Sequence, residues 1–204
     1  MFKDLFRADS WLWKPFGWLA DIVVLSLLWV VFCLPVVTIG GATAALYDAV
    51  VHDFRRKESD YMYRFFETFK AEWKRGILPT LVCGLAVGGV YAGYRLLVAF
   101  GTGNGAVMLA MGLLVLLCIP VGVTCWVFPI LSRFEQSGGT LLSNAVRLAL
   151  AHLPSTCAMA LVTGFCFWLS VQFWAIPLII LPALLVLFWS LFIERVFKAY
   201  GGDQ

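Results

Sequence analysis

The chain has 204 residues, of which 62% are hydrophobic, 16% aromatic and 13% charged, and its formal net charge is +3. Soluble domains are typically about 45–50% apolar and about 25% charged, so this composition excludes an ordinary soluble globule and a disordered chain. We predict an all-α polytopic membrane protein in which residues 1–204 form a single transmembrane domain. A spanning helix needs about 20 residues, so the chain holds about six spans and no separate catalytic domain.

The N-terminal part predicts an interfacial segment followed by a helical hairpin. Residues 2–17 mix aromatic and charged side chains, and we expect Trp11 and Trp13 to anchor a short helix in the headgroup layer. An apolar run over 18–39 continues into a helical stretch over 42–57. One helix over 18–54 would be about 55 Å long, well beyond a hydrocarbon core of about 30 Å. We therefore predict a turn near 35–41, where a proline and two glycines break the run.

Residues 60–75 predict an amphipathic helix that lies in the membrane interface. Its aromatic residues recur at helical spacing on one face, and basic and acidic residues occupy the other face. We expect four aromatic side chains of this helix to act as interfacial anchors: Phe65, Phe66, Phe69 and Trp73.

Two long apolar runs, 77–100 and 106–131, predict a second hairpin with a tight turn at 101–105. The first run carries two overlapping small-xxx-small patterns formed by Gly84, Gly88, Gly89 and Gly93, a spacing that lets membrane helices approach closely. We favour packing against another helix of the same chain, and a partner or dimer interface is the alternative.

The last third repeats the same order of elements. Residues 140–152 predict a weaker amphipathic helix, and the runs 154–170 and 175–193 predict a third hairpin. The chain therefore divides into three pseudo-repeat units, 1–58, 59–139 and 140–204, each with a cytoplasmic interfacial helix before its hairpin. Sequence identity between the units is slight, and similar chemistry at helix ends is the alternative explanation.

The distribution of positive charge predicts the orientation. All but one of the 15 Lys and Arg residues fall on one side of the six-span topology, and the opposite turns carry none. Positive residues stay cytoplasmic, so both termini are expected in the cytoplasm of a bacterial cell with a multi-pass protein in its plasma membrane. A five-span topology places the basic N-terminal residues outside and gives a worse separation.

Four polar residues within the apolar runs are candidates for an intramembrane site: Asp21, Asp48, His52 and Arg95. Asp48 and His52 are four residues apart and share a helix face, so they suit proton relay or cation binding. Alternatively, Asp48 pairs with a basic residue near the cytoplasmic end of a short helix. We favour an interfacial position near the helix N-terminus for Asp21, and a basic partner is the alternative. Arg95 is explained by a side chain that reaches the outer headgroups, and a role facing a substrate is the alternative.

Catalytic signatures are missing from the sequence. It contains no HExxH, GxSxG or Walker-type motif, and the two histidines, His52 and His152, are far apart, so we expect no enzyme activity, no cofactor and no metal site. The basic, aromatic segment 60–75 suits an acidic lipid surface better than nucleic acid.

The stretch LPVVTIGGATAALYDAV (34–50) resembles the YesL-like family of bacterial membrane proteins, a family of unknown function. Weaker similarity follows in Phe-x-x-Phe-Lys at 66–70 and in Phe-Pro-x-Leu-x-x-Phe at 128–134. The resemblance implies an accessory role beside a sugar ABC importer, and it brings no established site residues. The chain lacks the Glu-Ala-Ala loop by which an importer permease docks its ATPase.

Three functions therefore stay open at this point. The first is a non-enzymatic membrane accessory protein that binds a permease subunit of a carbohydrate or oligosaccharide importer. The second is a small autonomous transporter or channel, with Asp48, His52 or Arg95 lining its path. The third is a lipid-interacting or envelope-stress protein, suggested by the basic aromatic segment.

Overall fold

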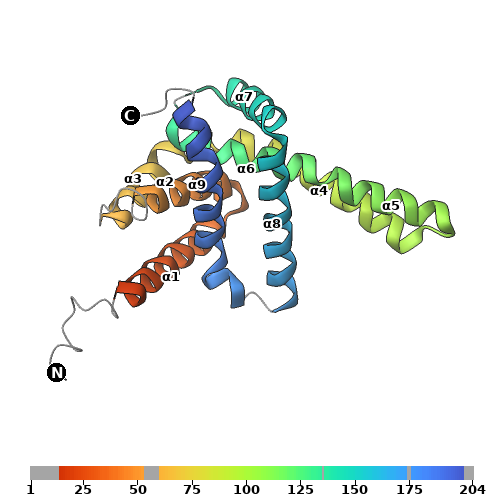
Figure 1. Ribbon diagram of the computed structural model, residues 1–204, viewed down its shortest axis with the longest axis horizontal. Coiled ribbons are helices and arrows are strands. Elements are labelled where there is room, and N and C mark those ends of the chain that lie inside the picture. The colour runs from red at the N-terminus through yellow and green to blue at the C-terminus, as the bar shows by residue number, and fades with distance from the viewer. Residues whose placement is uncertain (1–13, 53–59, 135, 174–175, 200–204) are drawn as a thin grey trace.

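The computed structural model describes residues 14–52, 60–134, 136–173 and 176–199 (Figure 1). These residues form helices and connecting turns, with no β-strand among them, so the all-α prediction is confirmed for this part of the chain. The predicted anchors Trp11 and Trp13 lie outside the described residues.

The first two helices are α1 (Lys14–Cys33) and α2 (Ile39–Val50), joined by a single-turn 3-10 helix, η1 (Val36–Thr38). The Thr38 hydroxyl donates to the carbonyl oxygens of Phe32 at 2.6 Å and Pro35 at 2.7 Å, which fixes this connection. The turn therefore falls at 34–38. The glycine pair that we placed at the turn lies inside α2 instead, where it has a packing role.

Helix α2 is the centre of the protein. It contacts α1, α3, α4, α6 and α9 (Figure 1), and every one of its residues except Ile39 and Asp48 is buried. Four alanines and two glycines keep this helix thin, so five neighbours approach it closely. With 12 residues it is about 18 Å long, which is shorter than a hydrocarbon core.

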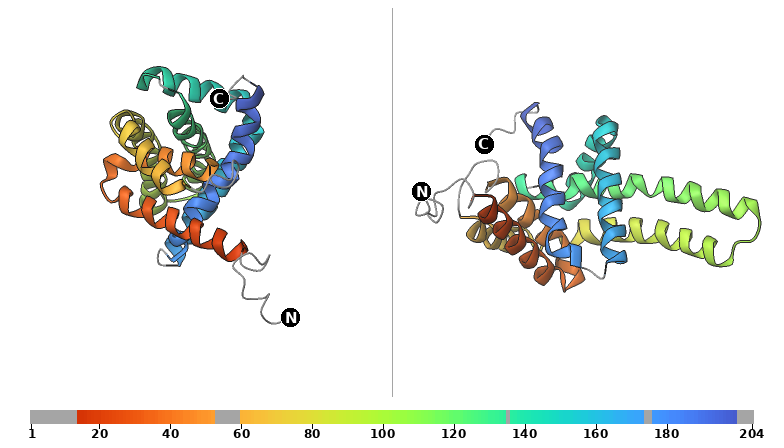
Figure 2. Two further views of the ribbon diagram at one scale, coloured as in Figure 1. Left: turned by 90° about the vertical axis from the view of Figure 1, so that its left-hand side faces the viewer. Right: turned by 60° about the horizontal axis from the view of Figure 1, so that its bottom comes forward.

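The middle of the chain forms α3 (Tyr61–Glu72), α4 (Ile77–Phe100), α5 (Asn104–Leu116) and α6 (Cys118–Arg133). Helix α3 packs on α2, and α4 pairs with α5. The α4–α5 hairpin projects away from the other helices (Figures 1 and 2). Its first arm has the bounds that the sequence predicted, because Gly76 and Gly101 flank an apolar run with a single charged residue, Arg95.

The last part forms α7 (Gly138–Ala151), α8 (Leu153–Gln172), the 3-10 helix η3 (Ile176–Ile179) and α9 (Leu181–Ala199). The predicted run from 175 is therefore broken, and α9 begins only at Leu181. Ser26 of α1 bridges this break, since its hydroxyl oxygen accepts the Ala183 N–H at 3.3 Å. The amphipathic helix predicted over 140–152 is confirmed, because Leu141, Ala145 and Ala149 are buried along one face of α7.

Three helical segments among the described residues are long and apolar enough to cross a membrane: Ile77–Phe100, Asn104–Arg133 and Leu153–Gln172. Leu19–Cys33 and Val36–Val50 are shorter apolar segments. Helices α8 and α9 run across the α4–α5 hairpin, not alongside it (Figures 1 and 2). The prediction of six spans in three hairpins is therefore not confirmed.

Candidate functional site

The structure brings two of the four candidate polar residues together. His52 Nδ1 lies 3.2 Å from Asp48 Oδ1 and 3.0 Å from the Asp48 carbonyl oxygen. The Thr68 hydroxyl of α3 donates to Asp48 Oδ2 at 2.7 Å. Both carboxylate oxygens of Asp48 thus have partners, and its side chain is only 12% exposed. The cluster joins the C-terminal end of α2 to α3, and its carboxylate–imidazole pair is chemically able to exchange a proton.

The other two candidates lie elsewhere. Asp21 is a half-buried residue of α1. Arg95 is an exposed residue near the far end of α4, on the projecting hairpin. No hydrogen bond or ion pair connects either side chain to the Asp48–His52 pair in the described part of the chain. The four residues therefore do not form one polar path.

A second polar cluster was missed by the sequence analysis. Arg133 of α6 pairs with Glu194 Oε1 of α9, and the Tyr47 hydroxyl of α2 donates to the same oxygen at 3.1 Å. The side chains of the ion pair are 14% and 10% exposed. The Arg133 guanidinium also lies 6.0 Å from the centre of the Phe197 ring, within cation–π range.

This second cluster joins the ends of three helices, α2, α6 and α9. The sequence indicated part of this cluster, because Arg133 and Glu194 each follow an apolar run that predicts a membrane span. Pairing them required knowing that α9 docks beside α6, a contact 61 residues apart in sequence. A mostly buried charge pair at these helix ends ties α6 to α9.

Three glycines form a close helix crossing. A Cβ atom added to Gly41 would lie 2.8 Å from the Trp73 Cα atom, and one added to Gly76 would lie 2.8 Å from the Gly41 nitrogen. At Gly40 it would lie 2.8 Å from the Gly76 carbonyl oxygen. Real Cβ atoms do not approach backbone this closely, so α2 meets the α3–α4 junction only because these positions lack side chains.

The glycines of α4 that we proposed for packing behave differently. A Cβ added to Gly84, Gly88 or Gly89 meets no described heavy atom within 4 Å, whereas at Gly93 it would lie 3.5 Å from Leu113 Cδ1. We predicted that these glycines pack against another helix of the same chain, and the described structure shows such a contact only at Gly93. The other three glycines lie on an open part of the hairpin.

The aromatic face of α3 packs mainly on protein. Phe65 is fully buried, and the Phe32 ring of α1 lies 5.6 Å from it, 5.7 Å from Phe66 and 4.6 Å from Phe69. Phe65 is thus unavailable to lipid, which does not fit the predicted role of an interfacial anchor. Phe66 and Trp73 keep 38% and 39% of their surface exposed and remain accessible from outside.

A metal site is not apparent in the part of the chain that the structure describes, where no three His, Cys, Asp or Glu side chains gather closely enough to hold an ion. The Asp48–His52–Thr68 and Tyr47–Arg133–Glu194 clusters are two polar groups that link different helices of the described structure.

Comparison with known proteins supports the resemblance seen in the sequence. Residues 22–94 match the family described as protein of unknown function, DUF624. This is the family that contains the YesL-like proteins. The DUF624 match spans most of α1, all of α2 and α3 and most of α4, so it includes both the buried central helix and the open glycines. No curated protein and no solved structure matches the chain.

Proposed function

We propose that the protein is a non-enzymatic integral membrane accessory protein that binds a permease subunit of a carbohydrate or oligosaccharide ABC importer. The observation that carries this proposal is the open glycine face of α4, where Gly84, Gly88 and Gly89 have no neighbouring helix in the described structure. The importer as partner comes from the YesL-like resemblance.

The physical argument concerns how helices associate in lipid. Apolar side chains gain little by leaving lipid for another helix, so association depends on close packing, for which glycines remove the obstacle. Leu81 and Leu85, which are 49% and 75% exposed, lie beside the glycines on α4. Together they offer a ridge and a groove to a transmembrane helix of another protein.

The membrane topology belongs to the same proposal. Six spans with both termini in the cytoplasm place the turn 101–105 outside a bacterial cell. The orientation rests on the one-sided distribution of Lys and Arg. A single cysteine introduced in that turn, in a cysteine-free background, should react with a membrane-impermeant maleimide in intact cells.

The test is an affinity purification of the tagged protein from native membranes in mild detergent, with partners quantified by mass spectrometry. We expect an importer permease in near-equal amount to the wild-type protein. Gly88→Leu should reduce its recovery about tenfold, because overpacking a contact costs about 1–3 kcal/mol. Gly164→Leu on α8 is the matched control, since an added Cβ there also meets open space.

Two outcomes contradict the accessory role. One is recovery of the wild-type protein without any transporter subunit, together with unchanged sugar uptake after deletion of its gene. The other is equal loss of the permease in both leucine variants, which would indicate a general effect of bulk in these helices.

A small autonomous transporter or channel is the alternative function, and the Asp48–His52–Thr68 cluster favours it. Liposomes that contain the purified protein should then pass a solute, and Asp48→Asn should abolish the flux. Glu67→Gln, which alters an exposed carboxylate of α3, should leave the flux unchanged. Equal flux in wild-type and Asp48→Asn liposomes would remove this cluster from any transport mechanism.

A further inference from the structure

Arg95 is the one charged residue in the sequence between Arg75 and Arg133. It lies on α4, its side chain is exposed, and no hydrogen bond or ion pair joins it to another described residue. An unpaired guanidinium on a long apolar hairpin is costly in a membrane unless it reaches the headgroup layer, where an anion from outside the chain can meet it. The chemistry of that anion follows from the level of Arg95 along the hairpin.

Both arms of the hairpin give a similar distance from the base of the hairpin to Arg95. Gly93 of α4 faces Leu113 of α5, so Arg95 lies at about the level of residue 111 on the opposite arm. Arg75 lies in the turn just before α4, and Arg95 lies 18 residues after Ile77, which is about 27 Å of helix. On the other arm, 22 residues separate position 111 from Arg133, or about 33 Å. Both lengths are close to the thickness of a hydrocarbon core, about 30 Å.

The neighbours of Arg95 also suit a headgroup layer. Tyr91 precedes it by one helical turn and is 41% exposed, and the Tyr94 ring lies 6.2 Å from the Tyr91 ring. Tyrosines concentrate where a membrane meets water, because their rings are apolar and their hydroxyls are polar. The arginine side chain is long, so its guanidinium extends several ångströms beyond the backbone of α4 into the headgroup layer.

The structure points to Arg95 as a binding site for the phosphate of a phospholipid in the leaflet opposite Arg75 and Arg133. A guanidinium donates two parallel hydrogen bonds to phosphate oxygens, and this geometry makes arginine the strongest side-chain partner for that group. The proposal rests on the membrane placement given under the proposed function. It does not depend on the importer.

The experiment uses the purified full-length protein, freed of lipid in detergent, with binding of single lipids followed by native mass spectrometry. Phosphatidylglycerol is compared with a glucosyl diacylglycerol of the same acyl chains, which lacks phosphate. We expect the wild-type protein to bind phosphatidylglycerol more tightly, and Arg95→Gln to weaken that binding about tenfold, the usual effect of losing charged hydrogen bonds. Arg95→Lys should retain part of the affinity.

Arg64→Gln is the matched control, because Arg64 is an exposed arginine of α3, outside the hairpin. It should bind phosphatidylglycerol as the wild type does. Millimolar inorganic phosphate should not displace the lipid, and displacement would identify a site for free phosphate and overturn the lipid assignment. Equal binding by wild type and Arg95→Gln, or equal binding of the glycolipid, would overturn the proposal.

The protein for this experiment is produced in a host that lacks the importer, so these outcomes are independent of whether a permease is recovered from native membranes. If Arg95→Gln fails to give a monodisperse protein, Arg95→Lys is compared with the wild type, because a lysine keeps the charge and loses the paired donors. Weaker binding of phosphatidylglycerol by Arg95→Lys supports the proposal, and equal binding overturns it.

Discussion

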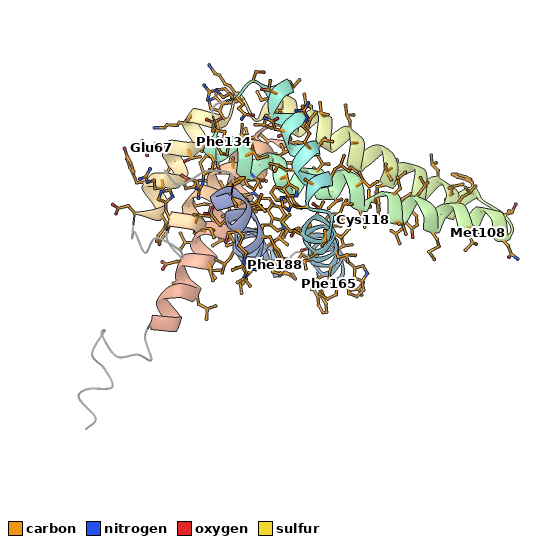
Figure 3. The ribbon with its side chains drawn as sticks, turned by 45° about the horizontal axis from the view of Figure 1, so that its top comes forward. Glu67, Met108, Cys118, Phe134, Phe165 and Phe188 are labelled. Atoms are coloured by element: carbon orange, nitrogen blue, oxygen red, sulfur yellow. The ribbon has the colours of Figure 1, made fainter. Side chains whose placement is uncertain are left out.

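The two ends of the molecule use the same small residues in opposite ways. Around α2, the glycines at 40, 41 and 76 let two backbones touch, and almost the whole helix is buried. On the α4–α5 hairpin, Gly84 and Gly88 face no described neighbour, and large side chains such as Met108 are 76% exposed. Figure 3 shows Met108 near the end of the hairpin, far from Glu67 on α3.

The difference shows what each end requires from its surroundings. At the α2 end, meaning α2 and the helices packed around it, side chains of the same chain cover the apolar surface and pair Arg133 with Glu194. The hairpin leaves its apolar surface to something outside the chain, either lipid or another membrane protein. We therefore expect substitutions at the α2 end to act on stability and substitutions on the hairpin to act on association.

The largest effect is expected from breaking the buried ion pair. Glu194→Gln leaves the mostly buried Arg133 guanidinium without its counter-charge, and removing one partner of a fully buried pair costs about 3–5 kcal/mol, which is the upper bound here. The measurement is the thermal midpoint of the detergent-solubilised protein, followed by size-exclusion chromatography. We expect a large fall, or loss of the monodisperse peak.

Glu67→Gln is the control for this prediction, because its partner Arg64 is 4.0 Å away and both side chains are about half exposed. Exposed pairs contribute about 0–1 kcal/mol, so the midpoint should barely move. The double variant Arg133→Met/Glu194→Met should be more stable than Glu194→Gln, because it leaves no unpaired charge behind. Equal midpoints for the Glu194→Gln and Glu67→Gln proteins would show that the buried pair does not hold α6 to α9.

A smaller effect is expected from adding one methyl group at each end. Gly41→Ala places a Cβ atom 2.8 Å from the Trp73 backbone, and overpacking of this kind costs about 1–3 kcal/mol. Gly84→Ala meets open space and should change stability by at most about 1 kcal/mol, in the stabilising direction. The comparison uses the same thermal measurement. A Gly41→Ala protein as stable as Gly84→Ala would contradict the close crossing.

The smallest effect is expected at the α2–α3 cluster. Thr68→Val removes one hydrogen bond to Asp48, which is part-buried, and should cost about 1 kcal/mol. The thermal midpoint should fall slightly, and recovery of the permease should be unchanged, because Thr68 lies outside the hairpin. A fall as large as that of Glu194→Gln would mean that this cluster carries more of the stability at the α2 end than its geometry indicates.

Much of the helical layout followed from hydrophobic periodicity. The bounds of α4 and the amphipathic character of α7 were predicted because apolar runs, helical periodicity and flanking glycines are local signals. The Asp48–His52 pair was predicted for the same reason, since four residues along a helix bring two side chains to one face. Thr68 was missed because it comes from another helix.

Other features depend on which surfaces meet, and a single sequence does not record this. The aromatic spacing of α3 is the same whether Phe65 faces lipid or the Phe32 ring. The glycine spacing of α4 is the same whether or not a helix of the same chain covers it. The pairing of Arg133 with Glu194 depends on the docking of α9, and the pseudo-repeat of three units stays a prediction.

The central claim is that another membrane protein covers the open face of α4. The most direct test is a photo-crosslinking amino acid at position 85, beside the glycines, in cells that produce the protein at native level. The matched control position is 161 on α8, since Leu85 and Leu161 are 75% and 64% exposed. We predict a crosslink to an importer permease from position 85 and none from position 161. Adducts of lipid alone at both positions would contradict the claim.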